Sequence, residues 1–295
     1  LAIAEIISLA RRLHEKSTAM HNGVWNKSAA GSHEVRGRTL GIVGYGNIGS
    51  QLSVIAEALG LSVVFYDIDD KLALGNAKKC ATIDELLAIA DVVSLHVDGR
   101  PGNAGLFGDE QMRAMKPRSL FLNLSRGIAV DTAALRQHLE SGHIAGAALD
   151  VFPVEPKAQG DPFESELRGV PNVILTPHVG GSTEEAQQDI GRFVASKLRA
   201  YAKAGTTNLS VTFPELNLPS DPARHRLAHV HTNAPGVLAT INTILGNHGV
   251  NIEGQQLATR GELGYVVTDV SAEVGVDVLK ELAGLPETVR LRQLS

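Results

Sequence analysis

The sequence predicts an α/β protein with a doubly wound, mostly parallel sheet, followed by a smaller α+β domain. Three observations carry this prediction. Short apolar segments alternate with amphipathic segments between residues 39 and 175, as in repeated strand–helix–strand units. A glycine-rich turn, GIVGYGNIG at residues 41–49, includes the end of the first apolar segment. After residue 222 the order restarts as strand, helix, strand, strand, helix, strand, which is a ferredoxin-like arrangement.

The composition is that of an ordinary globular protein. The 295 residues are 43% hydrophobic and 20% charged, which allows two or three domains with their own cores. A net charge of −5 gives no reason to expect nucleic acid or an anionic membrane as a partner. No apolar run approaches the roughly 20 residues of a membrane span. The single Cys80 excludes an internal disulfide and fits a reducing cytoplasm.

The first segment, residues 1–12, has a helical pattern without an initiator Met or an N-cap residue. It lacks the charged, apolar and small-residue order of a signal peptide. We therefore expect the chain to begin inside a longer protein.

The glycine-rich turn follows a short apolar strand and precedes an amphipathic helix that ends near Leu59. In this context Gly44 permits a tight turn, Gly46 lets a pyrophosphate approach the backbone, and Gly49 lets helix and strand pack closely. The phosphates would meet the free N–H groups of the new helix. The alternative is a plain strand–turn–helix with convenient glycines.

The next apolar segment, residues 61–66, ends at Asp67. This acid lies close to the spacing of about 20 residues expected for the group that accepts the ribose 2′-hydroxyl. Strand, helix and acid together favour a dinucleotide site. Asp67 is followed by Ile68, Asp69 and Asp70, so no neighbouring cation in the sequence is placed to neutralise a 2′-phosphate. The pattern therefore favours NAD over NADP.

The alternation continues beyond Asp67. Thr82 begins a helix with the pattern of a capping box. The following predicted elements are a strand at 91–97, a helix at 108–115, a strand at 120–124, a helix at 132–140, and strands at 145–150 and 173–175. Strands spaced by short helices indicate a parallel sheet, whose ligands collect beyond the carboxyl ends of the strands.

Three polar residues follow three of these strand ends: Arg126, Glu155 and His178. Arginine offers a planar fork for a substrate carboxylate. Histidine can take and return a proton near neutral pH, and a nearby carboxylate stabilises its charged form. Taken singly, each has a simpler explanation, as a solvated arginine, a loop glutamate or a turn histidine. Together on one rim beside a dinucleotide loop, they indicate a catalytic site.

These motifs resemble a known family. NLSRG, DVFPVEP and TPHVGGST, with the glycine-rich turn and Asp67, are similar to the signatures of the D-isomer-specific 2-hydroxyacid dehydrogenases, in the branch with a C-terminal regulatory domain. The resemblance runs from Leu1 to Ser295 and implies a Rossmann-like fold. It implies that His178 is the general acid/base, that Glu155 is its acid partner, and that Arg126 binds the carboxylate and the forming carbonyl. The family's segment before Leu1 would build most of the substrate lobe.

The resemblance also implies the NAD contacts. They fall on Gly44, Gly46, Asn47, Ile48, Gly49, Asp67, Leu124, Ser125, Arg126, Asp150, His178, Val179, Gly180 and Gly181. One stretch departs from the family: residues 98–103 read DGRPGN, where the family has a loop that begins with Pro and carries Thr or Ser. This departure concerns how the loop closes against the cofactor.

The motifs and the resemblance together predict three regions of the chain. We expect an NAD-binding domain at 1–181, a remnant of the substrate lobe and a linker at 182–222, and a regulatory domain at 223–295. The linker contains Pro214, Pro219 and Pro222 from residue 206 onward, so we expect it to be extended and to return toward the substrate lobe.

The predicted elements of the last part are strands at 226–231, 250–257, 264–270 and 288–294, with helices at 237–247 and 275–282. His225, His229 and His231 lie close together in the sequence, but they lack a fourth ligand and Cys80 is distant. We therefore expect no metal site.

The last part resembles an ACT domain. The resemblance implies that the turn at 231–236 and the stretch at 249–252 bind an amino acid across a subunit interface. His231, Asn233 and Asn251 are then candidate ligands for L-serine. The alternative is that Pro235 and Gly236 merely turn the chain.

The resemblance implies NAD-dependent oxidation of 3-phosphoglycerate at the start of serine synthesis, with inhibition by L-serine. One alternative is a dehydrogenase of another D-2-hydroxy acid, such as glycerate, lactate or 2-hydroxyglutarate. Another is a dinucleotide-sensing binding protein, because this fold also includes transcriptional corepressors. Pairing of the ACT-like domains and the apolar face of the Leu1 helix lead us to expect a homotetramer.

Overall fold

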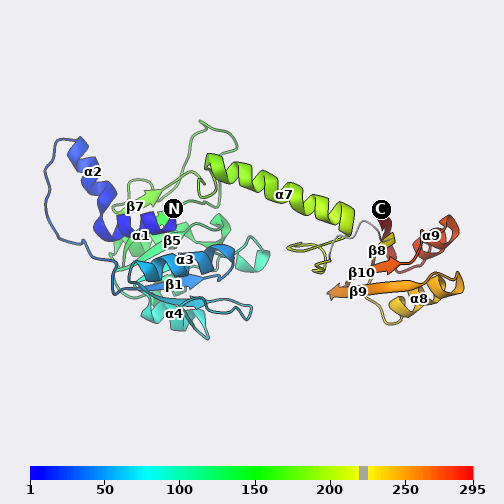
Figure 1. Ribbon diagram of the computed structural model, residues 1–295. Coiled ribbons are helices and arrows are strands. Elements are labelled where there is room, and N and C mark those ends of the chain that lie inside the picture. The colour runs from blue at the N-terminus through cyan, green and yellow to red at the C-terminus, as the bar shows by residue number, and fades with distance from the viewer. Residues whose placement is uncertain (219–224, 295) are drawn as a thin grey trace. The chain divides into compact units, whose positions relative to one another are not determined.

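The computed structural model describes residues 1–218 and 225–294. The chain forms two compact units, Leu1–Ser182 and Thr183–Ser295. Each unit has its own sheet (Figure 1). In the described part of the chain, no helix is both long enough and apolar enough to cross a membrane.

The first unit contains a seven-stranded sheet in the order β3-β2-β1-β4-β5-β6-β7. Every neighbouring pair is parallel, as predicted. The central strands are buried on both faces because helices cover both sides, so they consist of nearly continuous apolar residues. The strands are β1 (Thr39–Val43), β2 (Ser62–Tyr66), β3 (Lys78–Lys79), β4 (Val92–Leu95), β5 (Ser119–Asn123), β6 (Ile144–Leu149) and β7 (Val173–Leu175).

Two apolar cores, one on each face, hold this sheet between helices (Figure 1). On one face lie α1 (Ala2–Arg11) and α3 (Asn47–Ala58), and on the other lie α4 (Ile83–Ile89), α5 (Asp109–Ala114) and α6 (Thr132–Glu140). Helix α2 (Leu13–His21) buries none of its residues. Two short 3₁₀ turns are η1 (Pro101–Asn103) and η2 (Gly127–Ala129). The doubly wound prediction is therefore confirmed.

The apolar face of α1 is not free for an interface, and this prediction was wrong. Ile6 and Leu9 are each 1% exposed, and Ala10 is 4% exposed. They pack against strand residues such as Leu40 and Leu122 in the core of the first unit. The helix buries its apolar stripe against its own sheet because that burial is the main source of stability for so short a helix.

The second unit begins with α7 (Glu184–Ala204), a helix that the sequence analysis did not assign. Thr183 caps it by accepting a hydrogen bond from the N–H of Ala186 at 3.1 Å. It ends at Gly205, whose φ of 70° is the left-handed conformation that favours glycine. The segment assigned to a remnant and a linker is therefore helical over its first half.

The remainder of the second unit is a four-stranded antiparallel sheet in the order β11-β8-β10-β9. Its helices α8 and α9 share an apolar core with this sheet. The ferredoxin-like prediction is confirmed. The elements are β8 (His225–Thr232), α8 (Val237–Asn247), β9 (Ile252–Arg260), β10 (Leu263–Val270), α9 (Val276–Ala283) and β11 (Thr288–Leu294).

Residues 206–218 contain no helix or strand, as expected of a linker, but they do not leave the second unit. Phe213, Leu216 and Leu218 pack with residues of the four-stranded sheet such as Val230 and Tyr265. Burial of these apolar side chains holds the segment on the sheet. The expectation that this segment returns to a substrate lobe stays a prediction, because the residues expected to build that lobe precede Leu1. Pro219 and Pro222 lie outside the described residues.

Buried polar contacts also join α7 to this sheet. The Arg226 guanidinium donates to both carboxylate oxygens of Asp269, at 2.5 and 2.9 Å, and to the carbonyl of Ala204 at 2.8 Å. The Tyr265 hydroxyl donates to the carbonyl of Gly205 at 2.7 Å. Because these groups are buried, leaving any of them unpaired would be costly. Helix α7 and the sheet therefore behave as one unit.

Candidate active site

The strand order reverses between β1 and β4, where a doubly wound sheet binds its ligand. The three glycines after β1 meet different surroundings. A Cβ added to Gly44, whose φ is +93°, would lie 2.5 Å from the carbonyl oxygen of His96, and one added to Gly49 would lie 2.3 Å from that of Gly44. A Cβ at Gly46 would meet no atom within 4 Å. The turn is therefore closely packed at its ends and open in the middle, where a pyrophosphate can approach.

Asp67, at the end of β2, braces this turn. One carboxylate oxygen accepts a hydrogen bond from the N–H of Tyr45 at 2.7 Å, and the other accepts from the N–H of Asp69 at 2.9 Å. Carboxylate oxygens have lone pairs to spare for further donors, so these contacts leave room for ribose hydroxyls. Asn47 and Ile48 open α3 beside the turn and are exposed.

A cavity of about 390 Å³ lies at the switch point. It has Gly44, Gly46, Asp67, His96 and Val97 among its lining residues, together with Lys71 and Arg100. These two cations line the cavity that contains Asp67, although none of the three residues after Asp67 is a cation. Lys71 pairs with Asp69 at 3.0 Å, and Arg100 pairs with Asp98 at 2.6 Å. Each of the two cations that line the cavity therefore forms a salt bridge with a neighbouring aspartate.

The divergent loop at 98–103 is braced by its own side chains. The Asp98 carboxylate accepts from the guanidinium and the backbone N–H of Arg100 and from the side-chain amide of Asn103, at 2.6 to 3.2 Å. The hydrogen bonds from Arg100 hold the pKa of Asp98 below its usual value. Gly99 lies against Arg126, since an added Cβ would be 3.4 Å from the arginine Nε. The loop therefore borders both the cofactor cavity and the arginine.

Arg126 follows β5 in a turn held by Asn123. The fully buried Asn123 side chain accepts from the N–H and hydroxyl of Ser125 and donates to the carbonyl of Arg126 at 3.0 Å. A Cβ added to Gly127 would lie 2.0 Å from the carbonyl carbon of Phe152. The turn that contains Arg126 therefore packs directly against the backbone at Phe152, three residues before Glu155. Sequence reasoning missed Asn123; an amide at the end of an apolar strand was the available signal.

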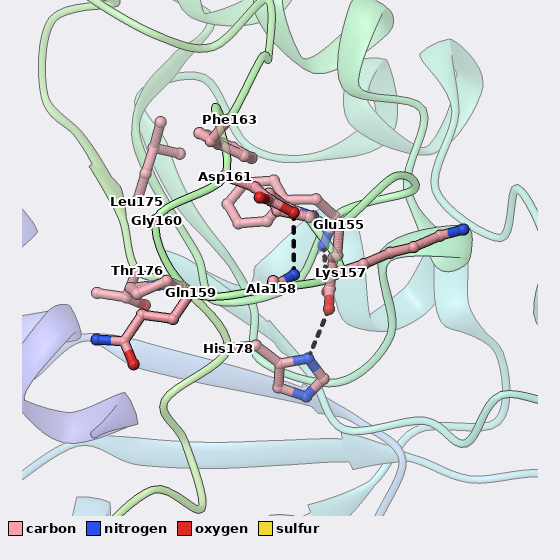
Figure 2. Close-up of a pocket in the computed structure, with 13 residues that line it drawn as sticks. Glu155, Lys157, Ala158, Gln159, Gly160, Asp161, Phe163, Leu175, Thr176 and His178 are labelled. Atoms are coloured by element: carbon pink, nitrogen blue, oxygen red, sulfur yellow. Dashed lines mark hydrogen bonds and ion pairs between the residues drawn. The ribbon is translucent and has the colours of Figure 1, made fainter.

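Glu155 and His178 form a hydrogen-bonded pair across the ends of β6 and β7. Glu155 Oε2 lies 2.9 Å from His178 Nδ1, while Oε1 accepts from the N–H of Phe152 at 3.1 Å (Figure 2). Burial raises the pKa of Glu155, but these hydrogen bonds and the charges of His178 and Arg126 outweigh burial and hold the pKa below its usual value. Glu155 is therefore ionised at neutral pH and faces the imidazole.

A second cavity, of about 650 Å³, opens beside this pair and includes Phe152, Phe163, Leu175 and Pro177 in its lining (Figure 2). The His178 side chain is 53% exposed and that of Glu155 is 34% exposed. The imidazole thus keeps Nε2 free of any hydrogen bond in the described structure, while Nδ1 meets the carboxylate. A ring with one nitrogen held and the other accessible can transfer a proton to or from a substrate.

Asp150, predicted as a cofactor contact, is 1% exposed. Its carboxylate accepts from the Thr176 hydroxyl at 2.6 Å and from the N–H groups of Val179 and Gly180 at 2.8 and 2.7 Å. The Asp150 carboxylate thus already accepts three hydrogen bonds from within the protein. Among the other predicted contacts, Leu124 and Val179 are half-buried, Ser125 is buried, and Gly181 is exposed.

Glu5 on α1 is a buried acid that the sequence analysis did not single out. It is 3% exposed, and neither carboxylate oxygen has a hydrogen-bond partner among the described residues. Burial, followed by repulsion from Asp150, raises the pKa of Glu5 to about 7. A charged residue on the apolar face of a helix is the signal that could have identified it.

The three candidate effector ligands lie in the second unit. His231 is 3% exposed, its Nδ1 lies 2.8 Å from the Thr232 carbonyl oxygen, and its ring packs on Gly264. Asn233 donates to the carbonyl of Gly261 at 3.1 Å, and Asn251 is exposed. In 1–218 and 225–294, no group of three His, Cys, Asp or Glu side chains is placed to hold a metal ion.

A doubly wound sheet with a turn suited to phosphates at its switch point, and with an accessible acid–base pair at the carboxyl ends of other strands of that sheet, defines a nicotinamide-dependent dehydrogenase. The chain belongs to the D-isomer specific 2-hydroxyacid dehydrogenase family. The NAD binding domain of that family matches residues 3–180. An AHAS small subunit-like ACT domain matches residues 227–290.

Relatives with established names support this membership. The chain is 48% identical over 294 residues to D-3-phosphoglycerate dehydrogenase of Dictyostelium discoideum and 49% identical over 296 residues to that of Escherichia coli K12. In both cases all of this chain and 72% of the relative are covered. D-3-phosphoglycerate dehydrogenase 1 of Saccharomyces cerevisiae is 49% identical over 284 residues, which cover 92% of this chain and 60% of the relative.

Solved structures show the same fold around NAD. D-lactate dehydrogenase with NAD⁺ from Lactobacillus jensenii has a TM-score of 0.61 at 29% identity, covering 68% of this chain and 63% of that one. Formate dehydrogenase from Staphylococcus aureus in complex with NAD has a TM-score of 0.61 at 29% identity, covering 68% and 60%. The chain thus spans less than two thirds of these solved chains. The predicted cofactor, NAD, is confirmed.

Proposed function

We propose that this chain carries the cofactor and proton-transfer parts of an enzyme that oxidises 3-phosphoglycerate with NAD to 3-phosphohydroxypyruvate, the first step of serine biosynthesis. The observation that carries the proposal is the 2.9 Å pair of Glu155 and His178, which follows strands of the same parallel sheet as the turn that suits a dinucleotide. The substrate is proposed from the names of the curated relatives, combined with the ACT domain at the C-terminal end.

Each polar residue has a proposed step. His178 takes the proton of the substrate C2 hydroxyl on its accessible nitrogen, Nε2. Glu155 stabilises the imidazolium that forms, because its carboxylate is already in contact with Nδ1. Arg126 binds the substrate carboxylate and the developing carbonyl oxygen. Bound NAD supplies the acceptor for the hydride that leaves C2, so two electrons and the hydroxyl proton are both accounted for.

The same residues would serve another D-2-hydroxy acid, so the substrate needs a direct test. Steady-state assays with NAD should compare 3-phosphoglycerate, glycerate and D-lactate, each with and without L-serine, in this chain and in any longer form of the protein that contains it. We expect the highest kcat/KM with 3-phosphoglycerate. A preference for glycerate or lactate would reject the proposed substrate, and binding of NADH without turnover of any acid would favour a dinucleotide-sensing protein.

Asp67 is proposed to select the cofactor. Its carboxylate should accept ribose hydroxyls and repel a 2′-phosphate, so we expect the chain to bind NADH well and NADPH poorly. Asp67→Ala should narrow this difference, while Asp70→Ala, at an exposed acid that pairs with Lys79, should leave it unchanged. Fluorescence titration with both nucleotides measures the effect. Equal affinities in the unmutated chain would reject the assignment.

L-serine is the proposed effector of the ACT domain, at a site shared by two copies. Asn233 follows β8, next to the start of β10, where Leu263 pairs with Thr232. Asn251 precedes β9, next to the end of β10, where Val270 pairs with Ile252. The eight residues of β10 span roughly 25 Å, so one copy cannot bring both amides to one amino acid. We therefore propose that two domains pair and that the protein is a homo-oligomer, with a tetramer as the expected assembly.

Calorimetry with L-serine tests this proposal. We expect binding that Asn233→Ala and Asn251→Ala each weaken, and that makes the paired form more abundant in sedimentation, because a ligand favours the state it binds better. Asn217→Ala, at an exposed amide outside the domain, is the control. Absence of heat with serine and with other amino acids would leave the domain without an effector role.

A further inference from the structure

The backbone at His178 has an unusual conformation. Its φ is 53°, in the left-handed region that few residues other than glycine adopt, although asparagine, aspartate and histidine are enriched there. Within the loop, the N–H of His178 donates to the carbonyl of Thr176 at 3.0 Å, which alone does not fix the residues that follow. A residue kept in this region needs surrounding structure to hold it there.

Asp150 supplies that hold on both sides of His178. One carboxylate oxygen accepts from the Thr176 hydroxyl before the histidine and from the Val179 N–H after it, at 2.6 and 2.8 Å. The other oxygen accepts from the Gly180 N–H at 2.7 Å. A Cβ on Gly180 would lie only 3.0 Å from that oxygen, so the absence of a side chain permits this contact.

Asp150 is itself well placed to act as a fixed point. It follows β6 directly, and its N–H donates to the carbonyl of Asn123 at 3.1 Å. Because the carboxylate is 1% exposed, water competes little for its three hydrogen bonds. Charge-assisted hydrogen bonds in such surroundings are short and strong.

We propose that Asp150 is a positioning residue: by holding the residues on both sides of His178, it directs the imidazole so that Nδ1 meets Glu155 and Nε2 faces the substrate. This inference rests on the proposed function of His178. It assigns Asp150 a role toward the histidine, beyond the contact with NAD that the family resemblance implies.

Asp150→Asn tests the proposal, because it keeps the size of the side chain but turns an amide NH₂ toward a donor. We expect kcat to fall by about 10²-fold, the scale of a small misplacement of a catalytic group, while NADH affinity changes little. Thr176→Val, which removes one of the three donors, should have a smaller effect in the same direction, and Thr176→Ser should restore the parent behaviour. Asp91→Asn is the control. Asp91 also accepts a hydrogen bond from a backbone N–H, that of Thr39, but neither residue belongs to the loop that contains His178.

The second readout is the ¹⁵N spectrum of the His178 ring in histidine-labelled chain, assigned with His178→Ala. The two ring nitrogens report which of them carries the proton, and this is set by the contact with Glu155. We expect both signals to move in Asp150→Asn, to move partly in Thr176→Val, and to be unchanged in Asp91→Asn.

Unchanged ring signals in Asp150→Asn would overturn the proposal, and weaker NADH binding in the same variant would show that Asp150 acts through the cofactor. If Asp150→Asn does not fold, Thr176→Val decides, and parent-like signals there would overturn it as well. The spectrum needs no substrate. A chain without turnover of 3-phosphoglycerate would therefore count against the proposed function and leave this measurement intact.

Discussion

His178→Ala is expected to lower kcat with 3-phosphoglycerate by about 10²- to 10⁴-fold, the usual contribution of a general acid or base. The reason is that His178 is the group with an accessible nitrogen next to an ionised carboxylate, at 2.9 Å from Glu155. NADH affinity should stay close to that of the parent, because the turn after β1 and Asp67 are untouched. Steady-state kinetics and fluorescence titration of NADH measure the two effects separately.

Glu155→Gln is the matched companion, because it keeps the size of the side chain and removes its charge. It should lower kcat less than His178→Ala does. It should also move the pH profile of kcat/KM, since the carboxylate no longer stabilises the charged imidazole. Glu164→Gln, at an exposed acid on the same loop, is the control. An unchanged pH profile in Glu155→Gln would remove Glu155 from the mechanism, and full activity in His178→Ala would remove His178.

Arg126→Ala is expected to lower kcat/KM by about 10²- to 10³-fold, the typical cost of removing one preorganised donor to a developing oxyanion. Arg126 lies in a turn held by the Asn123 side chain, it is exposed, and Gly99 of the 98–103 loop lies against it. Its charge also lowers the pKa of Glu155. Arg126→Lys should recover part of the loss, because an ammonium keeps the charge but lacks the planar fork.

The control for Arg126 is Arg136→Ala, which removes an exposed arginine of α6 that pairs with Glu140 at 2.7 Å. It should leave kcat/KM unchanged. If Arg126→Ala retained parent activity with 3-phosphoglycerate, glycerate and D-lactate alike, Arg126 would not bind the substrate carboxylate, and another cation would have to be sought.

Much of the fold followed from local patterns. The strands of the first unit are apolar because both faces are covered, and Thr82 caps α4 through its hydroxyl, as its spacing to Glu85 indicated. Helix α7 was missed although Thr183, Glu184 and Gly205 are typical of helix ends. Its segment had been assigned, together with the linker, to a remnant of the substrate lobe, and no secondary structure was predicted for it.

The partners of the polar groups did not follow from local patterns. Arg100 and Lys71 line the cavity that contains Asp67, yet neither cation lies within three residues of Asp67 in the sequence. Likewise, the apolar face of α1 was expected to meet another subunit, but it is covered by the chain's own sheet. An amphipathic pattern predicts which face of a helix will be buried, but it does not identify the element that covers that face.

The sequence by itself determined which residues leave the carboxyl ends of neighbouring strands, because alternating strands and helices produce a parallel sheet whose strand ends share one rim. It therefore placed Arg126, Glu155 and His178 together. Only the tertiary structure decided how their oxygens and nitrogens pair. Asp150 and Gly180 are 30 residues apart and meet at 2.7 Å, and a hydrogen bond is lost over less than an ångström. Separations that small are set by the packing of distant segments, which no local pattern encodes.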